Sequence, residues 1–212
     1  MFYQRYYKMS FEKSYLDGFC KELEKLGWKK LPPQVLDNYL IKEIFERKIE
    51  EINKEIFDAY REDKEKILNK LFLELQNADE VKMLDILRFG ADIVIKKWNS
   101  LIPLNIKLID YENIQNNEFN YTREQEVKYG NKMDRLDILL FVNGIPLVVI
   151  EGKSPIRKGF EDPYYEGLMQ IMRYQKELKS LFKFVQFGVV AADKNLYLPT
   201  FSKEKIRKLE GK

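Results

Sequence analysis

RLDILLFVNGIPLVVIEGKSP, residues 135–155, is the stretch that decides the fold of this chain. Two apolar runs flank Asn143-Gly144, and Asn-Gly between such runs is the strongest short-range signal for a β-hairpin, because both residues tolerate positive φ. The runs are apolar on both faces, so the sheet that contains them has to be covered on both sides. We therefore expect an α/β fold with a mixed central β-sheet flanked by helices.

Three charged residues lie at the open end of this hairpin, away from the turn. Asp137 opens the first apolar run, and Glu151 and Lys153 close the second. Burying an unpaired carboxylate or ammonium group costs several kcal/mol, so these charges suggest chemistry rather than folding. Side chains alternate along a strand, and Glu151 and Lys153 must therefore share one face.

Whether Asp137 joins that face depends on the loop of the hairpin. A two-residue turn at Asn143-Gly144 pairs Asp137 with Ile150 and places the two carboxylates on opposite faces. A three-residue loop with Gly144 left-handed pairs Asp137 with Val149 and brings all three charges together. We therefore expect the three-residue loop or a β-bulge.

The amino-acid sequence of this stretch also resembles that of a known family. An acid, a hairpin and then acid-x-Lys is the pattern of PD-(D/E)XK nucleases, and residues 135–155 are similar to the restriction (R) subunit of type I restriction-modification enzymes. Asn117-Glu118-Phe119 and Gln125 resemble a strand of that family, and residues 170–174 match its Gln-x-x-x-Tyr motif. The resemblance covers roughly residues 83 to 200. Gly152 departs from it, because the family carries a larger residue there, and we expect a looser strand.

The resemblance implies a restriction-endonuclease-like core over residues 83–212 and a mainly helical part, residues 1–82, that packs on it. Family members carry this nuclease at the start of a longer chain with an ATP-driven DNA translocase. No translocase motif occurs here, so we expect the N-terminal fragment of a longer, translocase-containing chain, with ATP used only by the absent region. The implied partners are double-stranded DNA and, through the full-length chain, the methyltransferase and specificity subunits of a type I complex.

The same resemblance assigns roles to the three charges. Asp137 and Glu151 are expected to hold Mg²⁺, with Mn²⁺ as an alternative, because hard divalent cations prefer carboxylate oxygens. The backbone carbonyl of Gly152 is a further candidate ligand. Lys153 is expected to orient or activate the attacking water and to offset phosphate charge.

Three other residues receive supporting roles by resemblance. Gln170 and Tyr174 lie one helical turn apart and are expected to position DNA. Glu12 matches an acidic helix residue of the family and is expected to close the site as an outer carboxylate. The chain is thus interpreted as a Mg-dependent endonuclease domain that hydrolyses DNA phosphodiester bonds.

Composition excludes other mechanisms. The chain has 212 residues, 45% of them hydrophobic, and a net charge of +3, so charge alone supports no partner. It contains no histidine, which excludes Ser-His-Asp hydrolysis and imidazole bases, and one cysteine, Cys20, which excludes a disulfide framework. No apolar stretch reaches bilayer length and the first residues lack a signal-peptide core, so a cytoplasmic protein without a membrane partner is expected.

Periodicity predicts the elements coarsely. Helices are expected from Ser10 to Gly27 and over 36–59, 62–76, 84–89 and 164–178, and strands over 105–110, 119–127, 136–142, 146–151, 184–191 and 196–198.

Each functional interpretation has a plainer alternative. The three charges could form a structural salt bridge at a sheet edge, and Gln170 and Tyr174 could be ordinary polar helix residues. Four cations could track phosphates or merely be solvated: Lys153, Arg157, Lys158 and Arg173. For the whole chain, the alternatives are a stand-alone PD-(D/E)XK repair or recombination nuclease, and a non-catalytic DNA-binding or assembly module of the same fold.

Overall fold

The computed structural model describes residues 2–36, 38–154 and 162–199. Contacts divide these residues into two units. The first, called the sheet unit, comprises residues 2–35, 119–141, 146–154 and 162–199, and the second, called the helical unit, comprises 36, 38–118 and 142–145. These units do not follow a boundary at residue 83. Residues 83–118 belong with the helices before them, whereas the first 35 residues belong with the sheet.

A six-stranded sheet forms the centre of the sheet unit, in the order β1-β4-β5-β6-β7-β8. Its strands are β1 Lys29–Leu31, β4 Phe119–Tyr129, β5 Lys132–Val142, β6 Ile145–Gly152, β7 Phe187–Ala191 and β8 Asn195–Pro199. β1 runs parallel to β4 and β6 parallel to β7, whereas β7 and β8 are antiparallel. The expected mixed sheet is confirmed.

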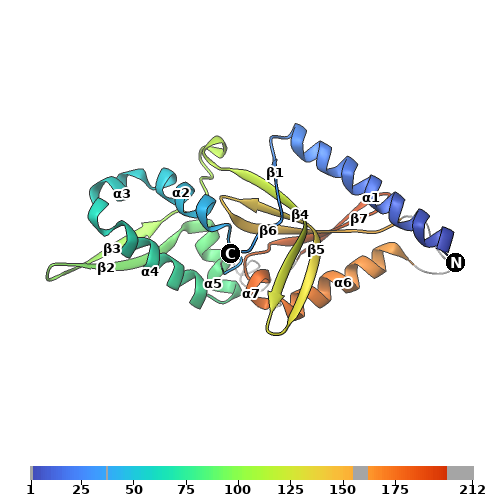
Figure 1. The fold of residues 1–212 in the computed structure, drawn as a ribbon. Coiled ribbons are helices and arrows are strands. Elements are labelled where there is room, and N and C mark those ends of the chain that lie inside the picture. The colour runs from blue at the N-terminus through green and yellow to red at the C-terminus, as the bar shows by residue number, and fades with distance from the viewer. Residues whose placement is uncertain (1, 37, 155–161, 200–212) are drawn as a thin grey trace. The chain divides into compact units, whose positions relative to one another are not determined.

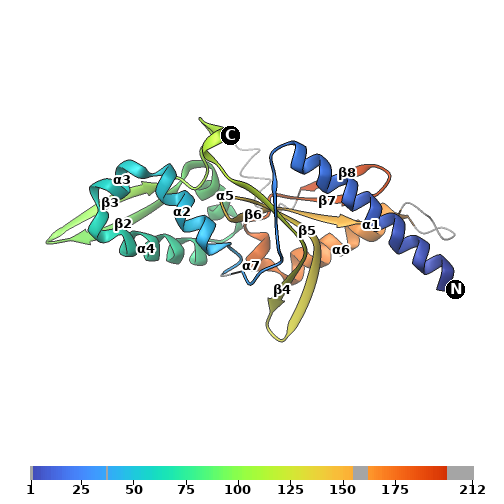
Figure 2. The same ribbon diagram turned by 45° about the horizontal axis from the view of Figure 1, so that its top comes forward.

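Helices cover both faces of this sheet (Figures 1 and 2). On one face, helix α1 (Phe2–Lys25) packs Leu16, Cys20 and Leu23 against a shared apolar cluster. The strands contribute to that cluster Tyr121, Ile138, Leu140, Val148, Ile150, Val189 and Ala191. On the other face, helix α6 (Pro163–Glu177) lies over β7, with α7 (Lys179–Phe182) after it. Both apolar runs of the hairpin are therefore buried from two sides, as the sequence predicted.

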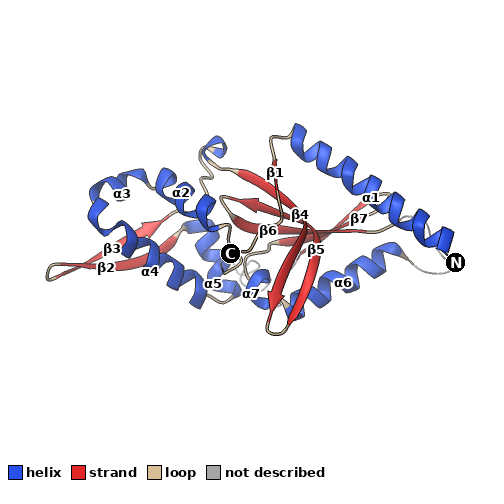
Figure 3. Cartoon of the chain, viewed as in Figure 1, coloured by secondary structure: helices blue, strands red, loops and turns tan. Residues whose placement is uncertain are grey.

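The helical unit holds four α-helices and a second, two-stranded sheet among its described residues (Figure 3). The elements are α2 Lys42–Ile52, α3 Lys54–Ala59, η1 Arg61–Asp63, α4 Lys64–Asn77, α5 Glu80–Phe89, β2 Ala91–Lys97, β3 Ser100–Ile106 and η2 Ile114–Asn116. The hairpin β2–β3 was missed from the sequence, where only a strand over 105–110 was expected. Its signal was the alternation of Ala91, Ile93 and Ile95, which are buried, with exposed residues. No helix in the described ranges is both long and apolar enough to cross a membrane.

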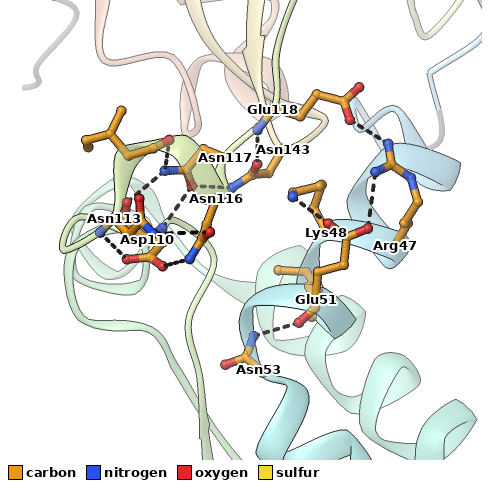
Figure 4. Close-up of polar contacts among 12 residues, drawn as sticks. Arg47, Lys48, Glu51, Asn53, Asp110, Asn113, Asn116, Asn117, Glu118 and Asn143 are labelled. Carbon is orange, nitrogen blue, oxygen red and sulfur yellow. Dashed lines mark hydrogen bonds and ion pairs between the residues drawn. The ribbon is translucent and has the colours of Figure 1, made fainter.

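The turn between β5 and β6 contains two residues, so the prediction of a three-residue loop was wrong. Asn143 and Gly144 have φ of 53° and 77°, the conformation of a tight primed turn. The Asn143 side chain is fully buried within the helical unit. It accepts from the Glu118 N–H and donates to Oδ1 of Asn117, each at 2.8 Å (Figure 4). It also donates to the carbonyl of Leu108 at 2.9 Å.

Gly144 permits a close backbone approach in the same unit. A Cβ atom there would lie 2.7 Å from the Ile41 carbonyl oxygen and 2.9 Å from the Phe45 nitrogen. The turn is thus held by its surroundings as well as by its own conformation.

Candidate active site

The predicted carboxylates meet in the interior of the sheet unit. Asp137 lies in β5 and Glu151 near the end of β6, two central strands of the sheet. Oδ2 of Asp137 accepts a hydrogen bond of 2.8 Å from the Gly152 N–H. Because β6 has a neighbouring strand on each side, the alternative of a salt bridge at a sheet edge does not describe these charges.

The register explains how the carboxylates share a face despite the short turn. Ile138 and Ile150 both belong to the cluster under α1, so their neighbours Asp137 and Glu151 point to the opposite face. A two-residue turn with uninterrupted pairing would separate them, since it pairs Asp137 with Ile150. One extra residue between the turn and the site resolves this, which is what a β-bulge supplies. The second of the two sequence expectations therefore fits the geometry.

Lys153, two residues after Glu151 and on the same face, contacts the Glu151 carboxylate. Its Nζ lies 3.1 Å from Oε1 of Glu151 and 2.8 Å from Oε1 of Gln170. Its backbone N–H donates to the carbonyl of Ala191 at 2.8 Å, which continues the pairing with β7. Lys153 is 6% exposed and Glu151 2%, so the pair is shielded from water and from salt.

Helix α6 completes the cluster. The Gln170 amide nitrogen donates both to Oε1 of Glu151 and, at 2.6 Å, to the hydroxyl of Tyr174. The structure thus brings the Gln-x-x-x-Tyr motif to the acid-x-Lys motif. Tyr174 is 1% exposed, so its contact is with Gln170, and Gln170 is the residue of the motif that reaches the charges.

Burial sets the electrostatics of the cluster. Desolvation, and after it the charge of Asp137, raises the pKa of Glu151 from its usual 4.5 to about 8, while Lys153 acts in the opposite direction. Desolvation and the nearby Glu151 likewise raise the pKa of the Tyr174 hydroxyl. Perturbed carboxylates of this kind are typical of functional sites.

One atom of the cluster is left unsatisfied. Oε2 of Glu151 is buried and has no hydrogen-bond partner, although its other oxygen has two. A buried carboxylate oxygen facing a second carboxylate is costly unless a cation shares it, so the donor set fits a hard divalent ion.

The expected outer carboxylate, Glu12, lies on α1. Within the described residues no three histidine, cysteine or acidic side chains gather as a metal-binding group, and the role of Glu12 stays a prediction. The structure brings together the two carboxylates of the prediction, with Gly152 between Glu151 and Lys153 in the chain.

Gly152 has a packing role that the sequence did not reveal. A Cβ atom there would lie 2.6 Å from Cδ1 and 2.8 Å from Cγ of Leu16. The glycine at this position therefore lets α1 approach the sheet closely beside the site. The looser strand that we expected from Gly152 stays a prediction.

Arg173, one of the four predicted phosphate-tracking cations, is instead paired. Its guanidinium contacts both oxygens of Asp134 at 2.9 and 3.1 Å and Glu177 at 2.9 Å. The Tyr129 hydroxyl lies within hydrogen-bond distance of the same two acids and shares its one proton between them. The i,i+4 spacing of Arg173 and Glu177 was a signal for part of this network. Two other candidates, Arg157 and Lys158, lie outside the described residues.

Comparison with known proteins matches the sequence of this chain to a family. The profile of the family described as "Type I restriction enzyme R protein N terminus" matches residues 17–207. Over 202 residues the chain is 38% identical to a provisionally named type I restriction enzyme MjaVIIIP endonuclease subunit of Methanocaldococcus jannaschii, covering 93% of this chain and 19% of the relative.

Two further relatives match shorter stretches. The provisionally named MjaVIIP endonuclease subunit of the same organism is 44% identical over 117 residues, covering 55% of this chain and 10% of the relative. The type I restriction enzyme HindI endonuclease subunit of Haemophilus influenzae is 32% identical over 87 residues, covering 41% of this chain and 8% of the relative. The chain therefore spans about a fifth or less of the length of these relatives.

Proposed function

The chain belongs to the family of type I restriction enzyme R protein N termini, and from that premise we propose that it is a Mg-dependent endonuclease domain that hydrolyses DNA phosphodiester bonds. The observation that carries the proposal is the convergence of Asp137, Glu151 and Lys153 with the unsatisfied Oε2 of Glu151. In the metal-free chain a proton shared with Asp137 satisfies that oxygen, and a metal ion held by both carboxylates would take the place of this proton.

Asp137 and Glu151 are the residues that would hold Mg²⁺ or Mn²⁺, with the backbone carbonyl of Gly152 as the further candidate ligand. When bound, such an ion polarises a phosphoryl oxygen and lowers the pKa of a water molecule. The orphaned oxygen and the raised pKa of Glu151 both support this assignment, because a cation satisfies the oxygen and replaces the proton.

Lys153 supplies the fixed positive charge of the site. Its ammonium is held by Glu151 and Gln170, which together accept two of its three donors. The third donor is available to orient a water molecule or a phosphate oxygen, where charge develops during in-line displacement. Gln170 fixes the orientation of both charged side chains, and Tyr174 fixes Gln170.

The activity of the whole protein belongs to a longer chain. The relatives are named as endonuclease subunits of type I restriction enzymes, and this chain covers at most 19% of those quoted. We propose that ATP-driven translocation and the contacts with methyltransferase and specificity subunits reside in that longer chain, and that double-stranded DNA is the substrate of this domain.

Calorimetric titration of the chain with Mn²⁺ or Mg²⁺ tests the proposal. Wild type should bind, Asp137→Ala should lose most of the affinity, and Glu126→Ala, which removes an exposed acid of the same sheet unit, should bind like wild type. Failure of the wild-type chain to bind either ion would favour the alternative of a non-catalytic module. Robust multiple-turnover cutting of linear DNA by this chain alone would instead favour a stand-alone repair or recombination nuclease.

A further inference from the structure

The hairpin of β4 and β5 continues past the metal-binding carboxylates. Its outer part, residues 126–135, is called the β4–β5 arm. Figures 1 and 2 show the turn end of this arm extending beyond the other strands of the sheet. Lys132 at the start of β5 lies five positions before Asp137, and a strand rises about 3.3 Å per residue, so the arm reaches roughly 17 Å from the site.

The arm is fixed to the helix that carries Gln170. Asp134 accepts hydrogen bonds from both terminal nitrogens of the Arg173 guanidinium. The Tyr129 hydroxyl lies 2.9 Å from Asp134 and 3.0 Å from Glu177 and shares its one proton between them. Bidentate pairs of arginine and carboxylate have a defined geometry, so this network holds the arm at a set position against α6. Arg173 offsets one of the two negative charges of the network, and Lys132 lies 3.9 Å from Glu177, which carries the other.

The cations of the arm, by contrast, are available. Lys128 and Arg135 are exposed, and among the described residues neither has a hydrogen-bond or ion-pair partner. Lys132, whose side chain is 70% exposed, only approaches Glu177 at 3.9 Å. Exposed Met133 lies beside them. Arg135 precedes Asp137 by two residues in β5, about 7 Å along the strand.

Charge is unevenly shared between the two units. The described residues of the sheet unit contain 17 lysines and arginines against 13 acids, a net charge of +4. Those of the helical unit contain 13 against 17, a net charge of −4. The near balance of the whole chain hides this separation. Within the sheet unit the excess lies mainly in residues 2–35, with seven lysines and arginines against four acids, whereas residues 119–141, which include the arm, contain four of each. The arm therefore acts through its exposed cations and not through the net charge of the unit.

We propose that the β4–β5 arm is a DNA-binding element, in which Lys128, Lys132 and Arg135 contact phosphates and hold the duplex across Asp137 and Glu151. The inference rests on the proposed nuclease function, since that function makes DNA the ligand of the site. Cations on a rigid strand contact the backbone without reading sequence, which suits a nuclease domain that recognises no site of its own. Because Arg173 pairs with Asp134, this acid is held against α6 and is not available to pair with the cations of the arm.

The test measures binding of a fluorescein-labelled DNA duplex to the 212-residue chain by anisotropy, without divalent ions, over roughly 50 to 200 mM salt. Lys128→Glu combined with Arg135→Glu should weaken binding and reduce the slope of log K against log salt by about 2, because each phosphate contact contributes about 0.9. Lys128→Glu alone, which leaves the residues of β5 next to Asp137 unchanged, should keep the Mn²⁺ affinity of wild type. Lys13→Glu combined with Lys21→Glu makes the same charge change on exposed positions of α1, across the sheet, and should have a smaller effect with an unchanged slope.

The arm proposal is overturned if the arm and α1 variants weaken binding equally while wild type still binds DNA and Mn²⁺. If wild type binds no DNA, both this proposal and the proposed function fail. The milder pair Lys128→Gln and Arg135→Gln, checked by circular dichroism, separates loss of contacts from loss of folding and should reduce the slope in the same direction.

Discussion

Nζ of Lys153 lies 3.1 Å from Oε1 of Glu151, in a position where both side chains are almost completely buried. A pair of this kind costs desolvation that its mutual attraction only partly returns, so it is weak support for stability. Its second carboxylate oxygen, Oε2, has no partner, which increases the cost further. The buried pair is therefore better explained by the binding of a cation at Glu151 than by a contribution to the stability of the fold.

Without divalent ions, the chain should become less stable as pH rises from about 5 to 9. The pKa of Glu151 is about 8 in the folded chain and near 4.5 when exposed, so folding favours the protonated form. This contribution is complete below the unfolded value and is lost as pH rises through the folded value. Urea unfolding in EDTA at several pH values should show a steeper decline for wild type than for Glu151→Gln, which cannot titrate. Parallel declines would contradict the assignment.

Divalent-ion affinity should rise with pH over the same interval. Binding at Glu151 displaces a proton below pH 8, so affinity increases by up to tenfold per pH unit between about 6 and 8. Calorimetry in buffers of different ionisation enthalpy counts the released protons, and we expect about one at pH 7. Release of none would mean that the ion binds without Glu151.

Gln170→Ala and Tyr174→Phe should weaken DNA cleavage in the full-length protein, and Tyr174→Phe, which leaves the contacts of Gln170 with Glu151 and Lys153 in place, should leave Mn²⁺ affinity almost unchanged. Gln170 holds both Glu151 and Lys153, so its loss frees two charged side chains that have to be positioned. Tyr174→Phe removes only the hydrogen bond to Gln170, worth about 0.5–1.5 kcal/mol, and should have the smaller effect. Loss of metal binding in Tyr174→Phe would show that the motif has been misassigned.

Local patterns predicted the parts of the site that follow from strand and helix periodicity. The alternation of β6 placed Glu151 and Lys153 on one face, and helical spacing placed Gln170 and Tyr174 together. The resemblance then linked the two motifs, which no periodicity could do, because 17 residues separate Lys153 from Gln170 in the chain.

What the sequence did not predict depends on contacts between distant segments. Asn-Gly predicted the hairpin and is itself a local signal for a two-residue turn, whereas the hydrogen bonds that bury Asn143 come from distant residues of the helical unit. Position 152 needs a glycine because Leu16, more than a hundred residues earlier in the chain, packs directly against it. The hairpin β2–β3 did have a local signal, the alternation from Ala91, which was overlooked.

Gly152→Ala should destabilise the chain by about 1–3 kcal/mol, because the added methyl group overlaps Leu16. Leu16→Ala alone should also destabilise, by loss of buried area. In the double variant the two effects should be less than additive, since the smaller side chain makes room for the methyl group. Urea unfolding of the four proteins gives the coupling, and strict additivity would contradict the close approach of α1 at this position.

Asn143→Ala should destabilise the chain by about 2 kcal/mol or more, whereas Asn131→Ala should change stability by less than about 0.5 kcal/mol. Both asparagines lie in two-residue hairpin turns, but Asn131 is exposed and Asn143 is fully buried. Removing the Asn143 amide leaves the Glu118 N–H, the Leu108 carbonyl and Oδ1 of Asn117 each without one partner, and alanine also disfavours a φ of 53°. Asn143→Gly separates these two costs, because glycine adopts that φ freely and should recover only the backbone part. Equal unfolding midpoints for Asn143→Ala and Asn131→Ala would show that the turn needs neither the buried amide nor its hydrogen bonds.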